Sequence, residues 1–157
     1  MAKLYFRYGA MNSGKSTALM QVAHNYEEQG MRVLILKPQV DTKGGGELVS
    51  RLGVFMVTVE LNIPVICYGL RSDFSLKGFP GSTRLLELAH TIEEMKTICT
   101  CGRKATCNCR KVNGEFVFEG EQVAIDLQND VQYVSMCPQC YFKARKAFYE
   151  KRGQSSD

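Results

Sequence analysis

Residues Gly9 to Ser16 match a phosphate-binding pattern: a glycine, four residues of any type, and then Gly-Lys-Ser. Glycines let the backbone turn tightly and approach a polyphosphate closely. The amide N–H groups of such a loop form a cradle for anionic oxygens, and the positive end of the following helix faces the same anion. Lys15 can reach the β- and γ-phosphates as a catalytic residue, and the Ser16 hydroxyl can bind Mg²⁺ beside it. The residues expected to bind ATP are Gly9, Ala10, Met11, Asn12, Ser13, Gly14, Lys15 and Ser16.

The segments around this loop follow the order strand, loop, helix and strand that the pattern requires. Lys3–Tyr8 alternates in polarity and is rich in aromatic residues, which predicts a strand. Thr17–Gln29 carries apolar residues at helical spacing, and Gly30 is placed to end that helix. Arg32–Lys37 reads as a second short strand, which Pro38 ends. The sequence therefore predicts an α/β domain with a parallel sheet.

Composition limits the classes of protein that this chain can be. Its 157 residues suffice for one domain, or for one domain with a small appendage. The fractions of 45% hydrophobic and 23% charged residues are typical of globular proteins. The net charge of +4 is mild and no dense run of lysine and arginine occurs, so we expect no nucleic acid as a partner. No signal-peptide pattern or membrane-length apolar run is present, so we expect a cytoplasmic protein with no membrane partner.

Two cysteine pairs in the second half of the chain indicate a metal site. Cys99 and Cys101 are followed by a glycine, and Cys137 and Cys140 enclose a proline, as in knuckle turns. Seven cysteines in a cytoplasmic chain favour metal binding or free thiols over disulfides. Four thiolates from two turns suit tetrahedral Zn²⁺ and leave no position open for chemistry. The zinc would therefore be structural.

Other cysteines leave alternatives open. The first pair is more closely spaced than the usual C-x-x-C pair, and Cys107 and Cys109 form a second C-x-C pair that could compete for the metal. Free thiols or a redox pair would also explain these residues. Cys67 lies inside the apolar run Ile63–Tyr68, so we expect it to be a small, buried core residue.

The remaining patterns organise the second half of the chain. Lys111–Phe116 contains Asn-Gly, the preferred two-residue turn of a β-hairpin. Ser82 is placed to cap a helix that runs to Ala89, and a C-terminal helix is expected to begin near Tyr141. Gly153–Asp157 is expected to be frayed. We expect a P-loop domain over residues 1–95, a small β-rich zinc ribbon with four cysteine ligands over 96–150, and a flexible tail over 151–157.

A P-loop domain followed by a cysteine-clipped ribbon resembles the type II thymidine kinases of bacteria and animal cytosol. The matching pieces are collinear and span nearly the whole chain. They are Leu4–Phe6, Ala10–Thr17, Ser50–Gly53, Ile63–Phe74, Lys96–Ala105, Gly120–Val123, Tyr133 and Cys137–Tyr141. The resemblance implies transfer of the ATP γ-phosphoryl group to the 5′-hydroxyl of thymidine, giving dTMP. It also implies Mg²⁺ with ATP, a structural Zn²⁺ and a homotetramer.

The resemblance also implies a nucleoside site between the two units. By analogy Asp41 lies near the metal and the phosphates, although it could equally form a plain turn. The implied substrate-binding residues are Leu70, Phe74, Val123, Ala124, Ile125 and Tyr133. For Leu70 and Phe74, ordinary packing is an equally good interpretation. The chain departs from the family after Ile125, where Asp-Leu-Gln replaces the usual glycines.

The chain departs further from the family because it lacks a whole segment. Relatives carry an apolar strand ending in Asp-Glu-x-Gln-Phe and then a helix, whereas this chain has only Val54–Leu61 there. The Asp supports Mg²⁺ and the Glu acts as the general base. A parallel crossover with its helix needs at least about 10–12 residues. One explanation is that residues are missing from this sequence, through a deletion or an omission, so that Phe55-Met56 and Val57–Glu60 are the ends of this segment. The other is a genuinely shortened protein that binds nucleotide but is catalytically impaired. The chain is then a thymidine kinase or, as the alternative, a catalytically impaired nucleotide-binding module.

Overall fold

The computed structural model describes residues 1–36, 58–122 and 130–153. Its elements are β1 (Leu4–Tyr8), α1 (Lys15–Glu28), β2 (Val65–Gly69), α3 (Pro80–Leu88), β3 (Thr91–Glu94), β4 (Thr97–Ile98), β5 (Lys104–Ala105), β6 (Cys107–Val112), β7 (Glu115–Val117), β8 (Val131–Met136) and α4 (Pro138–Lys151). Thr58 and Val59 are also helical, as expected if they end a helix. None of the helices described is long and apolar enough to cross a membrane.

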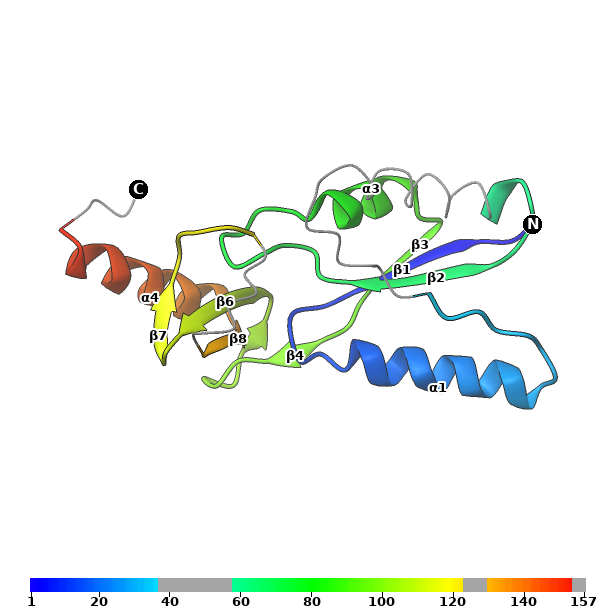
Figure 1. The fold of residues 1–157 in the computed structure, drawn as a ribbon, viewed down its shortest axis with the longest axis horizontal. Coiled ribbons are helices and arrows are strands. Elements are labelled where there is room, and N and C mark those ends of the chain that lie inside the picture. Colours follow the sequence, from blue (N-terminus) through cyan, green and yellow to red (C-terminus); the bar gives the residue numbers. More distant parts are fainter. Residues whose placement is uncertain (37–57, 123–129, 154–157) are drawn as a thin grey trace.

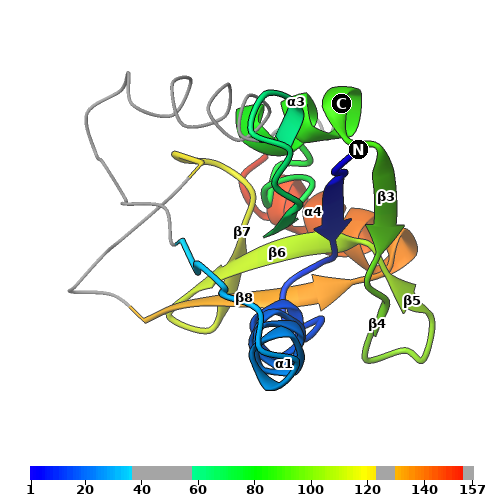
Figure 2. The same ribbon diagram turned by 90° about the vertical axis from the view of Figure 1, so that its right-hand side faces the viewer.

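A parallel sheet in the order β2-β1-β3 forms the first unit. Both views show this sheet between α1 on one face and α3 on the other (Figures 1 and 2). Leu4 and Phe6 alternate along β1 on one face and are completely buried. A Cβ atom added to Gly69 would lie 3.5 Å from the ring of Phe6 and 3.4 Å from the hydroxyl of Ser82, which places Phe6 on the α3 face. The strand Lys3–Tyr8 and the parallel sheet are confirmed.

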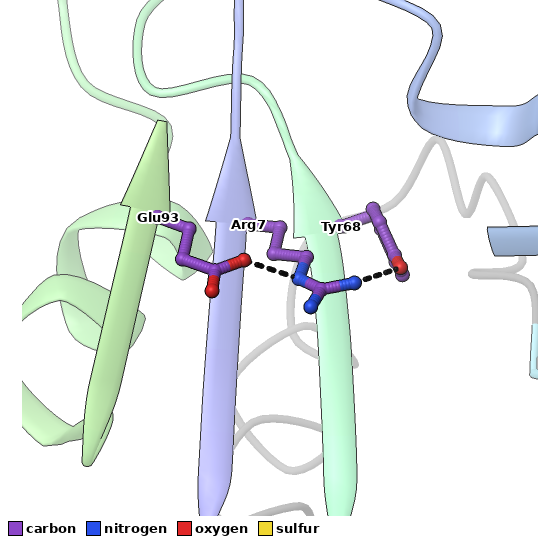
Figure 3. Close-up of polar contacts among 3 residues, drawn as sticks. All are labelled: Arg7, Tyr68 and Glu93. Atoms are coloured by element: carbon purple, nitrogen blue, oxygen red, sulfur yellow. Dashed lines mark hydrogen bonds and ion pairs between the residues drawn. The ribbon is translucent and has the colours of Figure 1, made fainter. Parts of the chain in front are cut away.

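A polar contact joins all three strands of this sheet near the carboxyl end of β1. Figure 3 shows Arg7 between Glu93 and Tyr68, its register partners on β3 and β2. Its Nε donates to the Glu93 carboxylate at 2.6 Å, and its Nη1 donates to the Tyr68 hydroxyl at 3.0 Å. The hydrogen bond to Tyr68, more than the hydrogen bond and charge of Glu93, raises the pKa of Arg7. Cross-strand pairs of this kind fix the register at the edge from which the P-loop leaves.

The second unit is β-rich and carries α4. The strands β4 and β5 form a short antiparallel pair, and β7-β6-β8 form an antiparallel sheet. Its core contains Cys107, Cys109 and Phe118 together with Tyr141 of α4. The predicted hairpin is confirmed, because Asn113 and Gly114 have φ of 50° and 83°, as a type I′ turn requires. The expected fold class is thus confirmed, while the exact domain limits stay a prediction.

One predicted strand is wrong over the residues that the structure describes. Arg32–Leu36 forms neither helix nor strand. Both edges of the central strand β1 are already paired, to β2 and β3, so this segment finds no place beside it. The side chains of Leu34 and Leu36 are 80% and 73% exposed. A strand needs a partner, and the hydrophobic pattern alone does not supply one.

Three local expectations also change. Cys67 is half-buried instead of a core residue, because β2 lies at the edge of the described sheet. Burial still raises the pKa of its thiol to about 11. Ser82 does not cap α3: Phe79 is the N-cap and the Ser82 hydroxyl donates to the carbonyl of Leu70. The helix α4 begins at Pro138, before Tyr141, because Cys137 caps it through a sulfur that accepts the Cys140 N–H at 3.5 Å.

A buried hydrogen bond ties the ribbon to the first unit. The hydroxyl of Tyr141, 1% exposed, donates to the carbonyl of Phe74 at 2.7 Å. We predict that Tyr141→Phe lowers the free energy of unfolding by about 1–2 kcal/mol, because it leaves a buried carbonyl unpaired. Tyr149→Phe on the same helix is the control and should change little. Equal stability of the two variants in urea unfolding would contradict this role.

Candidate functional site

The P-loop leaves the carboxyl end of β1 and leads into α1, on the side of the sheet that faces the ribbon (Figure 1). Two glycines are required for its shape. A Cβ atom at Gly9 would lie 2.7 Å from the carbonyl oxygen of Met95, and Gly14, the N-cap of α1, has φ of 78°. Asn12 also has a positive φ of 60°. The first turn of α1 has N–H groups without intrahelical partners, and these are suited to bind an anion.

Lys15 folds back into the loop. Its Nζ donates to the carbonyl of Ala10 at 2.7 Å and to the hydroxyl of Ser13 at 3.0 Å, with a longer bond of 3.3 Å to the carbonyl of Gly9. Burial lowers the pKa of this ammonium group. The neighbouring Ser16 is exposed in the first turn of α1. Lys15 is therefore held at the loop by neutral oxygens that a phosphate can replace.

Asn108, in β6, joins the P-loop to the segment after β2. Its Oδ1 accepts the backbone N–H of Met11 at 2.7 Å, and its Nδ2 donates to the carbonyl of Ser72 at 2.9 Å. The residue is only 3% exposed. A carboxamide has one donor side and one acceptor side, so this side chain fixes both segments at once. Sequence reasoning did not single out Asn108.

Two of the residues expected at the nucleoside, Phe74 and Tyr133, contact Arg110. Phe74 is 1% exposed, and the guanidinium carbon of Arg110 lies 3.7 Å from its ring centroid. The hydroxyl of Tyr133, half-buried in β8, accepts a hydrogen bond from Arg110 at 3.2 Å. Leu70 is half-buried directly after β2. The other expected contacts lie outside the described residues; they are Asp41, Val123, Ala124 and Ile125.

The four predicted metal ligands come together. The Sγ atoms of Cys99, Cys101, Cys137 and Cys140 all lie within 4.8 Å of one another, and those of Cys101 and Cys137 are 3.6 Å apart. In a tetrahedral site with Zn–S bonds of about 2.3 Å, the sulfur atoms are about 3.8 Å apart. The arrangement therefore fits Zn²⁺, and the set of four ligands fits a structural site.

The pKa shifts of the clustered thiols are consistent with a cation bound among the four cysteines. The backbone N–H of Cys101 is the largest of the contacts that lower the pKa of the Cys99 thiol to about 6. The backbone N–H of Cys140 lowers the pKa of Cys137. Hydrogen bonding to Cys137 and to the other thiols raises the pKa of Cys140 to about 12. The four thiols cannot ionise together without a compensating charge, and a divalent cation supplies it.

The competing pair, Cys107 and Cys109, lies elsewhere. Both residues are buried in the ribbon core, at 5% and 0% exposure, against Phe118 and Tyr141. Burial raises the pKa of Cys109 to about 12. Neither thiol belongs to the group of four whose sulfur atoms meet. Their position is that of small apolar core residues.

These features define a P-loop protein with a cysteine-clipped ribbon packed against its phosphate loop. A sequence model of the family described as thymidine kinase matches residues 2–63 and 55–141. The chain belongs to the thymidine kinase family, which confirms the resemblance to its type II members.

Bacterial thymidine kinases are similar over most of their length. That of Lactococcus lactis subsp. lactis is 39% identical over 188 positions, covering 91% of this chain and 98% of the relative. That of Idiomarina loihiensis is 40% identical, covering 87% and 94%. That of Rhodopirellula baltica is 37% identical, covering 96% and 92%.

The same alignments bear on the expected missing segment. The alignment of 188 positions is longer than the chain of 157 residues, so the relative carries internal residues that have no counterpart here. The family match falls into two pieces that overlap at residues 55–63. This overlap lies where the segment ending in Asp-Glu-x-Gln-Phe was expected.

The cysteine cluster yields a prediction with a matched control. We expect about one zinc per chain in the purified protein and a large loss of zinc in Cys101→Ser, because three thiolates hold the metal less tightly than four. Cys107→Ser should lower stability but keep the zinc content of the unaltered chain. Inductively coupled plasma mass spectrometry measures both. A folded, metal-free protein, or equal zinc loss in the two variants, would contradict the assignment.

Asn108 yields a second prediction. Asn108→Leu, of similar size, leaves the Met11 N–H and the Ser72 carbonyl unpaired, so the free energy of unfolding should fall by about 2 kcal/mol. Affinity for a non-hydrolysable ATP analogue should fall as well, because the loop loses its outer support. Gln132→Leu, an exposed position on the adjacent strand β8, is the control for a surface change. Unchanged stability and unchanged nucleotide affinity would show that the bonds of Asn108 are dispensable.

Proposed function

We propose that this chain binds ATP at the P-loop and thymidine at the ribbon, and transfers the γ-phosphoryl group to the 5′-hydroxyl to give dTMP. One observation carries the proposal: Asn108 bonds both to Met11 of the P-loop and to Ser72, two residues before Phe74. A single buried side chain thus adjoins the expected phosphate end and the expected nucleoside end. The reaction needs two substrates held end to end, and this arrangement supports that.

Phosphoryl transfer is catalysed chiefly by positioning and by neutralising charge. Lys15 would exchange its bond to the Ala10 carbonyl for one to a phosphate oxygen and so place a cation on the transferred group. The loop amides and the start of α1 would hold the remaining oxygens. Ser16, exposed beside Lys15, would supply one ligand to Mg²⁺, which neutralises phosphate charge when bound. Zn²⁺ on the four clustered cysteines would hold the ribbon in shape without taking part in the reaction.

A second candidate is favoured by the short stretch Val54–Leu61. In relatives, the segment missing here supplies an acidic metal ligand and the general base. A positioned general base contributes roughly 10²–10⁴-fold to a rate. Glu60 is exposed next to the helical residues 58–59, and no contact found among the described residues marks it as a replacement. The chain would then bind both substrates and transfer phosphate slowly or not at all.

From the family resemblance we also propose a homotetramer in the cytoplasm, with neither membrane nor nucleic acid as a partner. Analytical ultracentrifugation tests the assembly. A monomer at micromolar concentration would contradict it without touching the proposed reaction.

The deciding experiment uses a recombinant chain of 157 residues, and intact mass spectrometry checks that its mass equals the 17.6 kDa calculated from the sequence. With Mg-ATP and thymidine, we expect formation of dTMP that falls by about 100-fold or more in Lys15→Met, since one electrostatic stabiliser of a transition state is lost. Lys146→Met, exposed on α4, is the control and should keep full activity.

Calorimetry on the same samples separates the candidates. Binding of both substrates without dTMP formation would support the binding module. Absence of ATP binding would refute both candidates.

A further inference from the structure

Arg110 is a buried cation in β6. It is 3% exposed, yet none of the ion pairs found within residues 1–36, 58–122 and 130–153 includes it. A buried arginine normally has a carboxylate partner, because an uncompensated charge is costly to bury. The contacts that Arg110 makes in place of a carboxylate therefore indicate its role.

Two aromatic residues supply part of the compensation. The guanidinium carbon lies 3.7 Å from the ring centroid of Phe74 and 5.6 Å from that of Tyr133. Its Nε donates to the Tyr133 hydroxyl at 3.2 Å. A desolvated cation over an aromatic face is a strong attraction, and the planar group also fixes the ring that it covers. The two rings are the described aromatic residues that the family resemblance assigns to the nucleoside.

Backbone carbonyl groups are further partners of Arg110 among the described residues. The Nη2 group of Arg110 donates to the carbonyl of Glu121 at 2.7 Å and to that of Gln122 at 3.1 Å. The turn before them also packs on this guanidinium, since a Cβ atom added to Gly120 would lie 3.5 Å from Nη1. Gly120 has φ of 117°, which favours glycine. One side chain thus holds residues 120–122 by main-chain contacts that do not depend on their side chains.

We propose that Arg110 is a positioning residue for the nucleoside: it sets the Phe74 ring, the Tyr133 hydroxyl and the backbone of residues 120–122 in one fixed arrangement. This inference rests on the proposed function, because thymidine is the ligand it serves. Asn108, two residues earlier on the same face of β6, contacts the P-loop instead. The strand therefore supports the nucleotide through one residue and the nucleoside through the other.

The contacts of Arg110 depend on the planar guanidinium group with its several N–H donors, more than on the positive charge. Lysine would keep the charge but could not stack on Phe74 and bond to Tyr133 and two carbonyls together. Arg110→Lys should therefore weaken thymidine binding by about tenfold or more, as the loss of hydrogen bonds to a charged group implies. Affinity for a non-hydrolysable ATP analogue should stay within about twofold, because the P-loop contact of Asn108 is kept.

The experiment is titration calorimetry of the full chain with thymidine and, separately, with the Mg-bound ATP analogue. Arg152→Lys is the matched control, because Arg152 also stacks on a ring, that of Phe148 at 5.0 Å, but lies half-exposed at the end of the ribbon. It should leave both affinities unchanged. Zinc content and thermal unfolding are measured on every variant.

Selective loss of thymidine affinity in Arg110→Lys supports the inference. Wild-type thymidine affinity in that variant, or a parallel fall of both affinities, overturns it. Should Arg110→Lys fail to fold, Gly120→Ala displaces the same backbone from the guanidinium and must show the same selective loss. An unaltered chain that binds the ATP analogue but no thymidine would refute the proposed function, and this inference with it.

Discussion

The meeting of four sulfur atoms within 4.8 Å is the constraint on which the ribbon depends. Cys99 and Cys101 come from the turn after β4, whereas Cys137 and Cys140 come from the junction of β8 and α4. The cluster therefore closes the ribbon on itself, and β8 in turn pairs with β6 along its whole length. Because thiolates repel one another without a cation, a metal bound by these cysteines would couple the folding of the ribbon to the placement of β6.

The strand β6 connects the ribbon core to the candidate site, because one of its faces packs in the core and the other contacts the first unit. Cys107 and Cys109 point into the core under α4, while Asn108 and Arg110 alternate with them and contact the first unit. Side chains on a strand alternate strictly, so the core residues determine which residues face the P-loop. A register slip of one residue would exchange the two sets. The hairpin turn at Asn113-Gly114 and the pairing with β8 both oppose such a slip.

The parts of the fold that local chemistry dictates could be predicted from the sequence. The P-loop, the helix after it and the Asn-Gly hairpin each follow from residues within a few positions of one another. The conformation of Arg32–Leu36 could not be predicted from its own residues, because a strand also needs a neighbouring strand, which the local sequence does not reveal. Arg110 was missed for a related reason: its partners Phe74 and Tyr133 are distant in sequence. The alternation of cysteine with Asn108 and Arg110 predicts a strand with one apolar face, but it does not reveal that the polar face is buried as well.

The edge of the first sheet bears on how chaperones and proteases would act on the protein in a cell. All five residues of β2 are only half-buried, and the apolar side chains of Leu34 and Leu36 are largely exposed. Within the described residues β2 has a strand partner on one side only, and an unpaired strand edge is a template on which further chains can pair. Chaperones and proteases act on this kind of surface, and small differences in stability change abundance several-fold under their action. We therefore expect quality control, as well as synthesis, to affect the steady-state amount of this protein.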